Sequence, residues 1–347
     1  MRTALLAASA ALALTLPLSA EEAAKPAALA PSEIVAAAPK SDWKAIPAED
    51  LLVMTLAPDA DGKPRTVVIQ LMPAPFSQGW IHNIRLFARA KWYDGISVNR
   101  VQDNYVTQWG DPNYDNPEAT GKPKSLPKGL KVMTEAEYIA GVEHIMLVGG
   151  DRYPVSHEPH IDHLNRDDAF ASATGFVSGW PVGVQLDRGR FSKRDLRKDP
   201  QLEVRSAWPT HCYGMVGVGR NYSPDTGSGA ELYTVIGHAP RHLDRNIALV
   251  GRVIEGMHHL SSLPRGSGDL GFYTAEEAAK RTPILTVRVA SDLPAGEQPR
   301  FEYLSTDSAT FDRYAEAIAN RRDPFFIVPA GRADICNVKV PVRRVAQ

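Results

Sequence analysis

Short runs in which apolar and polar residues alternate recur along the chain, and this two-residue period is typical of half-buried β-strands. An Asp-Gly pair at 61–62, between the first two runs, indicates a hairpin turn. The runs that predict strands lie at 51–57, 65–73, 99–112, 212–219, 230–237, 246–256, 283–291, 323–329 and 336–342.

Apolar residues at helical spacing are less frequent. The clearest case is 76–95, where Trp80, Ile81, Ile84 and Phe87 recur every three to four residues. Helices are predicted within 76–95, 134–150, 255–263 and 307–322, the second from the capping-box pair Thr134 and Glu137 and the last with Asp307 or Ser308 as its cap. Many short strands with few helices predict a mostly β domain, either a barrel or a sandwich.

Two segments of the chain lack a clear period. Residues 21–48 are rich in Ala, Pro and Lys, which predicts a flexible leader. Residues 113–205 hold many Pro, Gly and charged residues and predict a long, loop-rich insertion. The chain carries 39 Lys and Arg against 40 Asp and Glu, so its charge gives no reason to expect nucleic acid or an anionic membrane as the main partner.

The first residues, "MRTALLAASAALALTLPLSAEEAA", have the layout of a secretory signal peptide. Arg2 precedes an apolar run, and the small-residue site Leu18-Ser19-Ala20 predicts cleavage after Ala20. A membrane anchor is the alternative, but the run is short and contains Pro17. The sequence therefore predicts signal peptide 1–20, export to the periplasm and no stable membrane insertion.

Export bears on the two cysteines, Cys212 and Cys336. An oxidising compartment permits a disulfide, and two cysteines allow one intramolecular pairing. The alternative is a pair of buried free thiols, and the sequence leaves both possibilities open.

The run "NRVQDNYVTQWGDP" places Arg100 and Gln108 eight residues apart. On one extended strand an even spacing directs both side chains to the same face. Such a face, with aromatic neighbours, suits a peptide-binding surface, although an ordinary solvated strand face would have the same pattern.

Several blocks, in the correct order, resemble the cyclophilin-type peptidyl-prolyl cis-trans isomerases. "VVIQLMP", "HNIRLFARAKWYDGISVNRV" and "YVTQWGDP" resemble the family's second strand, helix, arginine-bearing strand and glutamine block. "GMVGVGRNYSPDTGSGAELYTVIG" and "HLDRNIALVGRVIEGM" resemble its later blocks, so that the resemblance covers about 50–118 and 205–290. It implies a closed eight-stranded antiparallel barrel capped by two helices over 49–290, with the insertion at about 113–205. Residues 291–347 are then a C-terminal extension packed on the barrel, which a Cys212–Cys336 bond would tie down.

The resemblance also implies the roles of individual residues. Arg100 falls on the catalytic arginine and Gln108 on the substrate-binding glutamine. Nine further positions fall on the substrate-binding surface, several of them with altered side chains: Tyr105, Val106, Gly219, Arg220, Glu231, Leu232, Tyr233, His242 and Leu243. The implied activity is isomerisation of X-Pro bonds in exported proteins by a monomer without a cofactor. The altered positions motivate an alternative, a proline-peptide binding module or chaperone with little turnover.

A third hypothesis is a metal binder or metal-dependent hydrolase built on "HEPHIDH", which contains His157, His160 and His163. Its spacing is not that of a His-Glu-x-x-His helix, and Pro159 would interrupt such a helix. The sequence therefore predicts no metal site.

Overall fold

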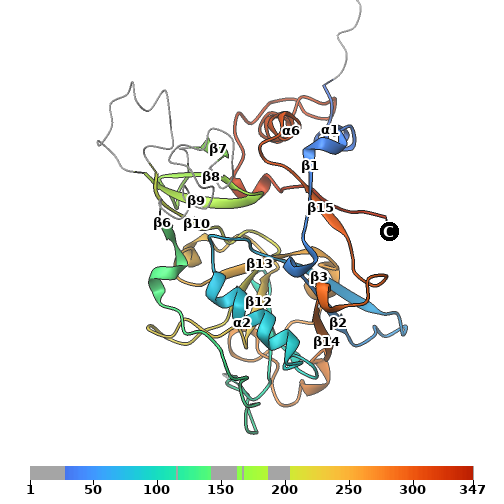
Figure 1. The fold of residues 1–347 in the computed structure, drawn as a ribbon, viewed down its shortest axis with the longest axis vertical. Coiled ribbons are helices and arrows are strands. Elements are labelled where there is room, and N and C mark those ends of the chain that lie inside the picture. Colours follow the sequence, from blue (N-terminus) through green and yellow to red (C-terminus); the bar gives the residue numbers. More distant parts are fainter. Residues whose placement is uncertain (1–27, 115, 142–161, 166–167, 187–203, 347) are drawn as a thin grey trace, which may run out of the picture.

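The computed structural model describes residues 28–346, except for 115, 142–161, 166–167 and 187–203. Figure 1 shows a barrel below a smaller unit that is made from both ends of the chain and an internal segment. No helix in this described part of the chain combines the length and the apolar character needed to span a membrane.

The barrel is one antiparallel sheet of eight strands in the order β14-β2-β3-β13-β11-β12-β5-β4. Its strands are β2 (Leu51–Leu56), β3 (Arg65–Leu71), β4 (Ser97–Val101), β5 (Val106–Gly110), β11 (Met215–Val218), β12 (Leu232–Val235), β13 (Leu249–Glu255) and β14 (Ile284–Val289). The two edge strands approach each other, because Val98 N donates to Thr282 O (2.9 Å) and Ile284 N donates to Ile96 O (2.8 Å). The sheet is therefore nearly closed, and the predicted mostly β barrel is confirmed.

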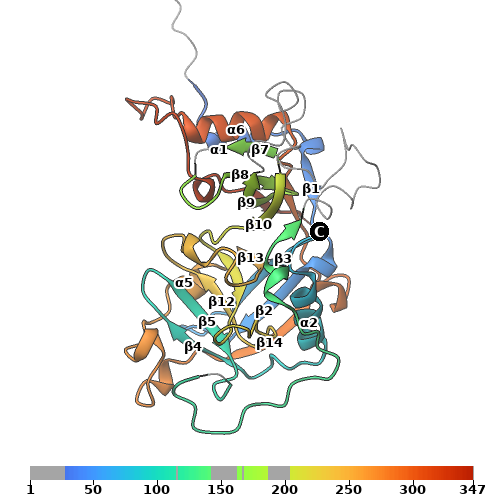
Figure 2. The same ribbon diagram turned by 90° about the vertical axis from the view of Figure 1, so that its left-hand side faces the viewer.

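Two helices flank the barrel on opposite sides, α2 (Gln78–Arg89) and the short α5 (His258–Ser261) (Figure 2). The apolar face predicted for α2 is buried in the barrel core. Its Trp80 also donates from Nε1 to the carbonyls of Thr226 (3.1 Å) and Gly227 (3.0 Å). Helix α2 thus covers the barrel and holds the loop that precedes β12. The 3-10 turns of the chain include η1 (Lys40–Asp42), η2 (Ala48–Asp50), η5 (Arg241–Leu243), η6 (Asp269–Gly271), η7 (Ala278–Lys280) and η8 (Ala290–Asp292).

The prediction that residues 113–205 are loop-rich was wrong in part, because four strands within them join β10, which extends beyond them to Pro209, in a five-stranded sheet of order β6-β10-β9-β8-β7. The strands are β6 (Ala140–Gly141), β7 (Asp162–Asn165), β8 (Ala173–Val177), β9 (Trp180–Leu186) and β10 (Val204–Pro209). Strand β8 is buried throughout and β9 nearly so, and strands buried on both faces lose the alternation on which the prediction depended. Gly183 within β9 leaves room for Trp208, because a side chain at this position would overlap the Trp208 ring.

The helix expected at 134–150 was also not found in the described residues. They form a 3-10 turn, η3 (Glu135–Tyr138), followed by β6, and the remainder lies outside the described residues. The capping box is present, because the Glu137 carboxylate accepts from Thr134 N (2.8 Å). The cap signal was therefore right, but the turn it begins does not continue as an α-helix.

The inserted sheet joins two other segments in what we call the accessory unit: residues 28–47, the sheet β6–β10 and residues 291–346. The terminal segments contribute α1 (Pro31–Ala36), α6 (Ala309–Ala319) and a sheet in which β15 (Phe301–Leu304) lies between β1 (Trp43–Ala45) and β16 (Val342–Arg344). Figure 2 shows α1 and α6 side by side, above the strands of the inserted sheet. The predicted flexible leader was therefore wrong from residue 31 onward, because its Ile34 and Trp43 are buried in a cluster with residues more than 100 positions away.

The C-terminal extension contains the expected helix, α6, whose cap Ser308 accepts from Phe311 N at 3.1 Å. Helix α6 packs on α1 and on Phe176 of the inserted sheet. The extension contacts the barrel through Phe301 and Tyr303, which precede this helix. The strand expected at 323–329 is instead an exposed loop, in which Phe325, Ile327 and Val328 are 84%, 95% and 77% exposed. The strand expected at 336–342 is instead the end of the turn η9 (Ile335–Asn337) followed by irregular backbone, and β16 begins where that strand was expected to end.

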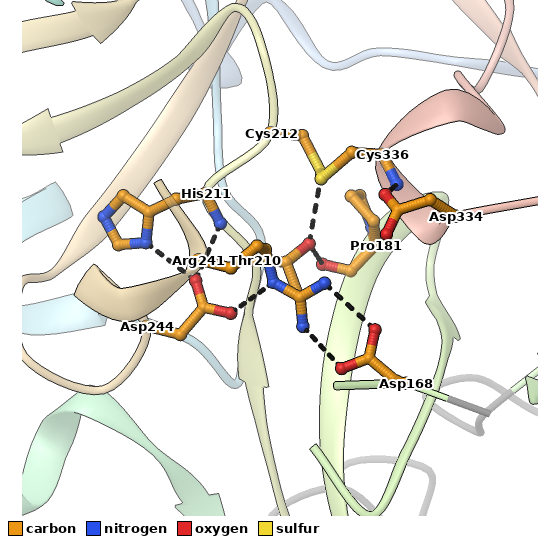
Figure 3. The surroundings of a disulfide bond; sticks show 9 residues. All are labelled: Asp168, Pro181, Thr210, His211, Cys212, Arg241, Asp244, Asp334 and Cys336. Atoms are coloured by element: carbon orange, nitrogen blue, oxygen red, sulfur yellow. Dashed lines mark hydrogen bonds and ion pairs between the residues drawn. A yellow bond between two sulfur atoms is a disulfide. The ribbon is translucent and has the colours of Figure 1, made fainter. Parts of the chain in front are cut away.

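Cys212 and Cys336 form a disulfide with an S–S distance of 2.05 Å (Figure 3). Cys212 follows β10 at the point where the chain returns to the barrel, and Cys336 lies in η9 of the extension. The bond therefore links the C-terminal extension to the segment that joins the inserted sheet to the barrel.

Candidate active site

The stretch expected to be a single strand over 99–112 is a hairpin. Strand β4 ends at Val101, Asn104 takes a positive φ of 50°, and β5 begins at Val106. In the antiparallel register Arg100 is directly opposite Gln108. The two side chains therefore share a face as cross-strand neighbours and not as members of one strand.

The Arg100 guanidinium is held by three hydrogen bonds. Its Nη1 donates to Gln108 Oε1 (3.1 Å), its Nε donates to the carbonyl of Leu270 (2.6 Å), and its Nη2 donates to Gln102 Oε1. A guanidinium has five N–H hydrogens, so these bonds engage three of them. Arg100 is thus fixed in orientation while two of its N–H groups are not used by these bonds.

Two aromatic rings lie close to the same guanidinium. The Arg100 Cζ atom is 5.6 Å from the centre of the Tyr105 ring and 5.4 Å from that of Phe272. Burial lowers the pKa of Arg100, although a guanidinium stays charged at neutral pH. Burial also raises the pKa of Tyr105, against the opposing effect of Arg100. The site therefore keeps a positive charge in surroundings that screen it less than water does.

A cavity of about 270 Å³ opens beside Arg100. Eight of the eleven predicted site residues line it: Arg100, Tyr105, Val106, Gln108, Gly219, Arg220, Tyr233 and Leu243. Val106 and Tyr233 are buried and form one apolar cluster with Val235, against which Ile247 packs. The cavity thus combines an apolar end with a polar end at Arg100 and Gln108.

Gly219 lines the cavity next to Gln108 and Glu231. A Cβ atom at this position would lie 2.8 Å from the Glu231 Cβ atom and 3.5 Å from Gln108 Nε2. The small residue therefore keeps the Gln108 amide accessible from the cavity. Arg220, the next residue, donates to the carbonyls of Asn246 (2.9 Å) and Asn221 (2.6 Å) and closes this end.

Three predicted substrate-binding residues do not line the cavity. Leu232 points into the barrel core, because alternation along β12 directs Tyr233 outward and its neighbours inward. Glu231 is buried against Gly110 and borders a separate hollow beyond Arg220. His242 lies exposed on η5, outside the cavity. The block resemblance located the correct segments but not the direction of these three side chains.

Four other residues complete the cavity: Pro117, Ile247, Leu270 and Phe272. Ile247 was recognisable as the replacement of a pocket histidine, but the sequence analysis did not assign it to the site. Leu270 and Phe272 had no such signal, since they belong to an irregular segment around η6 in which Leu270 takes a positive φ of 55°. Their position over Arg100 depends on a long-range hydrogen bond that no local pattern reveals.

The metal hypothesis falls largely outside the described residues. His157 and His160 lie in 142–161, and His163 belongs to β7, of which the backbone alone is described. Within the described residues no group of three or more His, Cys, Asp or Glu side chains is arranged to hold a metal ion.

Comparison with known proteins gives two findings. The family model described as cyclophilin type peptidyl-prolyl cis-trans isomerase/CLD matches residues 79–289. Among solved structures, the chain is similar to cyclophilin AquaCyp293 from Hirschia baltica, with 20% sequence identity and a TM-score of 0.58, over 87% of this chain and 93% of that chain. That overlap extends beyond the residues matched by the family model, so the shared fold includes part of the accessory unit. A search of curated proteins gave no significant match.

Proposed function

Because the chain belongs to the cyclophilin-type peptidyl-prolyl cis-trans isomerase family, we propose that it accelerates rotation about X-Pro bonds at the cavity beside Arg100. The observation that carries this proposal is the placement of a half-buried, oriented guanidinium at the edge of an apolar cavity. Eight residues that the family resemblance implied as site residues meet there, although they come from separate segments of the chain.

Rotation about a peptide bond is slow because nitrogen donates its lone pair into the carbonyl, which gives a barrier of about 18–20 kcal/mol. For X-Pro bonds the two isomers are close in energy, so the catalyst has only to stabilise the twisted state. In that state the lone pair is localised on the prolyl nitrogen and can accept a hydrogen bond. An N–H of Arg100 that is not bound to Gln108, Gln102 or Leu270 supplies that hydrogen bond.

The remaining residues hold the substrate on both sides of the rotating bond. Val106, Tyr233, Leu243 and Ile247 form the apolar end of the cavity, which suits the proline ring. The Gln108 amide faces the position where the substrate backbone would pass Gly219. With the ring fixed, the segment that precedes proline rotates while Arg100 stays in place.

A second function is favoured by one specific observation, the three hydrogen bonds that occupy Arg100. If the guanidinium cannot turn from the Leu270 carbonyl towards a substrate, the cavity would bind proline peptides without turnover. The protein would then act as a proline-peptide binding module or chaperone.

One experiment separates these functions. Exchange of a short Ala-Pro peptide is followed by NMR with the wild-type protein, with Arg100→Ala and with Arg100→Lys. An isomerase accelerates exchange, Arg100→Ala abolishes the acceleration, and Arg100→Lys does not restore it, because lysine lacks the rigid donor fork. Equal acceleration by wild type and Arg100→Ala would contradict the assigned role. Chemical-shift changes on peptide addition without acceleration would establish the binding module instead.

We also propose that the protein acts on exported proteins in the periplasm. The predicted signal peptide 1–20 supports this. The Cys212–Cys336 disulfide also supports it, since structural disulfides persist in oxidising compartments. N-terminal sequencing of the protein from a periplasmic fraction tests it, and a mature chain beginning at Glu21 is expected. A protein that retains Met1 or is recovered in the cytoplasm would contradict the proposal.

A further inference from the structure

Tyr233 connects the floor of the cavity to a buried chain of polar side chains. Its ring lines the cavity, and its hydroxyl lies 2.9 Å from Nε2 of His211. The Tyr233 hydroxyl lies so close to Gly217 that any side chain at position 217 would overlap it. In the family blocks that the sequence resembles, the position of Tyr233 is a phenylalanine, which has no hydroxyl to make this bond.

The chain continues through His211 to Asp244. Nδ1 of His211 and its backbone N–H are both 2.9 Å from Asp244 Oδ1. A carboxylate can only accept, so Nδ1 carries the proton and Nε2 accepts from the Tyr233 hydroxyl. Burial lowers the pKa of His211, which keeps the ring neutral, and burial raises the pKa of Tyr233 well above its usual value, which keeps its proton.

Arg241 carries the chain from the barrel into the accessory unit (Figure 3). Its Nε donates to Asp244 Oδ2 (2.6 Å), and its two Nη atoms donate to the two carboxylate oxygens of Asp168 (3.2 Å each). Asp168 belongs to the inserted segment between β7 and β8. The side chains of Asp168, Arg241, Asp244 and His211 are 5%, 2%, 3% and 0% exposed.

We propose that Asp168, Arg241, Asp244 and His211 act through Tyr233 as positioning residues, so that the inserted segment sets the apolar floor on which a proline ring binds. Each of the four links is geometrically directed: a bidentate guanidinium–carboxylate pair, a single guanidinium–carboxylate bond, a carboxylate–imidazole bond and an imidazole–hydroxyl bond. Buried polar chains of this kind hold one arrangement, because a broken link leaves its neighbours desolvated and unpaired. A change at Asp168 therefore alters the cavity floor without touching a substrate.

The inference rests on the proposed function for its substrate, and its test is a double-mutant cycle between Asp168→Asn and Tyr233→Phe. Three quantities are measured: the KM and kcat of peptide exchange, the affinity for an Ala-Pro peptide by NMR titration, and the methyl shifts of Val106 in the free protein. Asp61→Asn is the matched control, since Asp61 is exposed in the β2–β3 turn and pairs with Lys63.

We expect Asp168→Asn to raise KM and weaken peptide affinity by about three- to tenfold with a smaller change in kcat. It should also shift the Val106 methyl signals, and both effects should be absent when Tyr233 is already phenylalanine. Equal effects of Asp168→Asn in the two backgrounds, or lower thermal stability with unchanged affinity and Val106 shifts, would overturn the inference. If Asp168→Asn does not fold, Arg241→Lys replaces it in the same cycle.

The same measurements keep the two proposals apart. A wild-type protein that neither accelerates exchange nor binds the peptide removes the proposed function. The Val106 shifts of the free protein then still decide whether Asp168 acts on the cavity floor through Tyr233.

Discussion

The barrel and the accessory unit differ in how far apart along the chain their contacts lie. In the barrel, β2 pairs with β3 and β4 pairs with β5 across short turns, and one large apolar cluster fills the interior. In the accessory unit, Trp43 of β1 pairs with Leu304 of β15, and the inserted sheet contributes Phe176 to the same small core. The barrel also pairs distant strands, such as β2 with β14, but it combines them with these hairpins, whereas the small core of the accessory unit needs three distant segments at once.

The junction between the two parts is unusually polar for a buried surface. Besides the chain that ends at Asp168, Arg252 of β13 donates to Gln70 Oε1 (2.8 Å) and to the carbonyl of Gly179 (2.9 Å), and it stacks on Trp180 at 4.4 Å. Burial lowers the pKa of Arg252 to about 10. Directed bonds such as these fix one orientation, whereas an apolar junction would tolerate sliding.

The largest expected effect comes from the covalent link between the terminal and central segments. The paired variant Cys212→Ser with Cys336→Ser should lose about 5 kcal/mol of unfolding free energy, the chain-entropy value for a loop of this length, here a separation of 124 residues. Urea unfolding with and without a reductant measures it. The wild type should be sensitive to the reductant and the paired variant insensitive. A wild type that is equally stable in both conditions would show that the three segments need no covalent link.

The next effect tests the core of the accessory unit. Phe311 is fully buried and meets Phe176 edge-to-face with ring centres 5.2 Å apart. Phe311→Ala should cost about 3–5 kcal/mol through lost burial and the cavity left behind. Hydrogen exchange of both parts is the measurement: protection lost in α1, β8 and α6 while β3 and β13 stay protected would show that the barrel is independent. Uniform loss of protection would make the two parts one cooperative unit.

This comparison also explains what the sequence could and could not reveal. Alternation predicted β2, and helical spacing predicted α2, because each has one face that is more buried than the other. Strands β3 and β13 were predicted as runs rich in β-branched residues, although each has four or more consecutive buried residues. Strands β8 and β9 have nearly continuous burial, and α1 and β1 have too few apolar residues for a pattern. In the site, the blocks located Arg100 and Gln108, but the direction of Leu232 and the approach of Leu270 and Phe272 depend on strand register and on a long-range bond.

A smaller effect is a change of stability with pH through His211. Burial lowers its pKa below the ordinary 6.5, with Asp244 opposing and Arg241 and His242 adding to the shift, and the Tyr233 hydroxyl faces its other nitrogen. As the pH falls, His211 therefore takes up its proton at a higher pH in the unfolded chain than in the folded protein. The contribution of His211 to the free energy of unfolding is therefore complete above pH 6.5. It is lost as the pH falls from 6.5 to the lower pKa that His211 has in the folded protein. His211→Gln should flatten this part of the pH profile in urea unfolding.

The wild-type profile contains other histidines, including His259, whose pKa burial also lowers. The informative quantity is therefore the difference between the wild-type and His211→Gln profiles. Two profiles that run parallel from pH 7.5 to pH 5 would contradict the buried, neutral state of His211.

The smallest expected effect is in the loop that follows α6. Phe325, Ile327 and Val328 are largely exposed in this loop, which extends beyond α6 in Figure 2. Because they bury little surface, changing each to serine should alter the unfolding free energy by at most about 0.5 kcal/mol. These losses of unfolding free energy are to be compared with that of Phe311→Ala, since all of these changes remove aromatic or aliphatic side chains from the same unit. A loss above about 1 kcal/mol in the loop would mean that these side chains are covered in solution. A dependence of that loss on protein concentration would then identify the cover as a second copy of the chain.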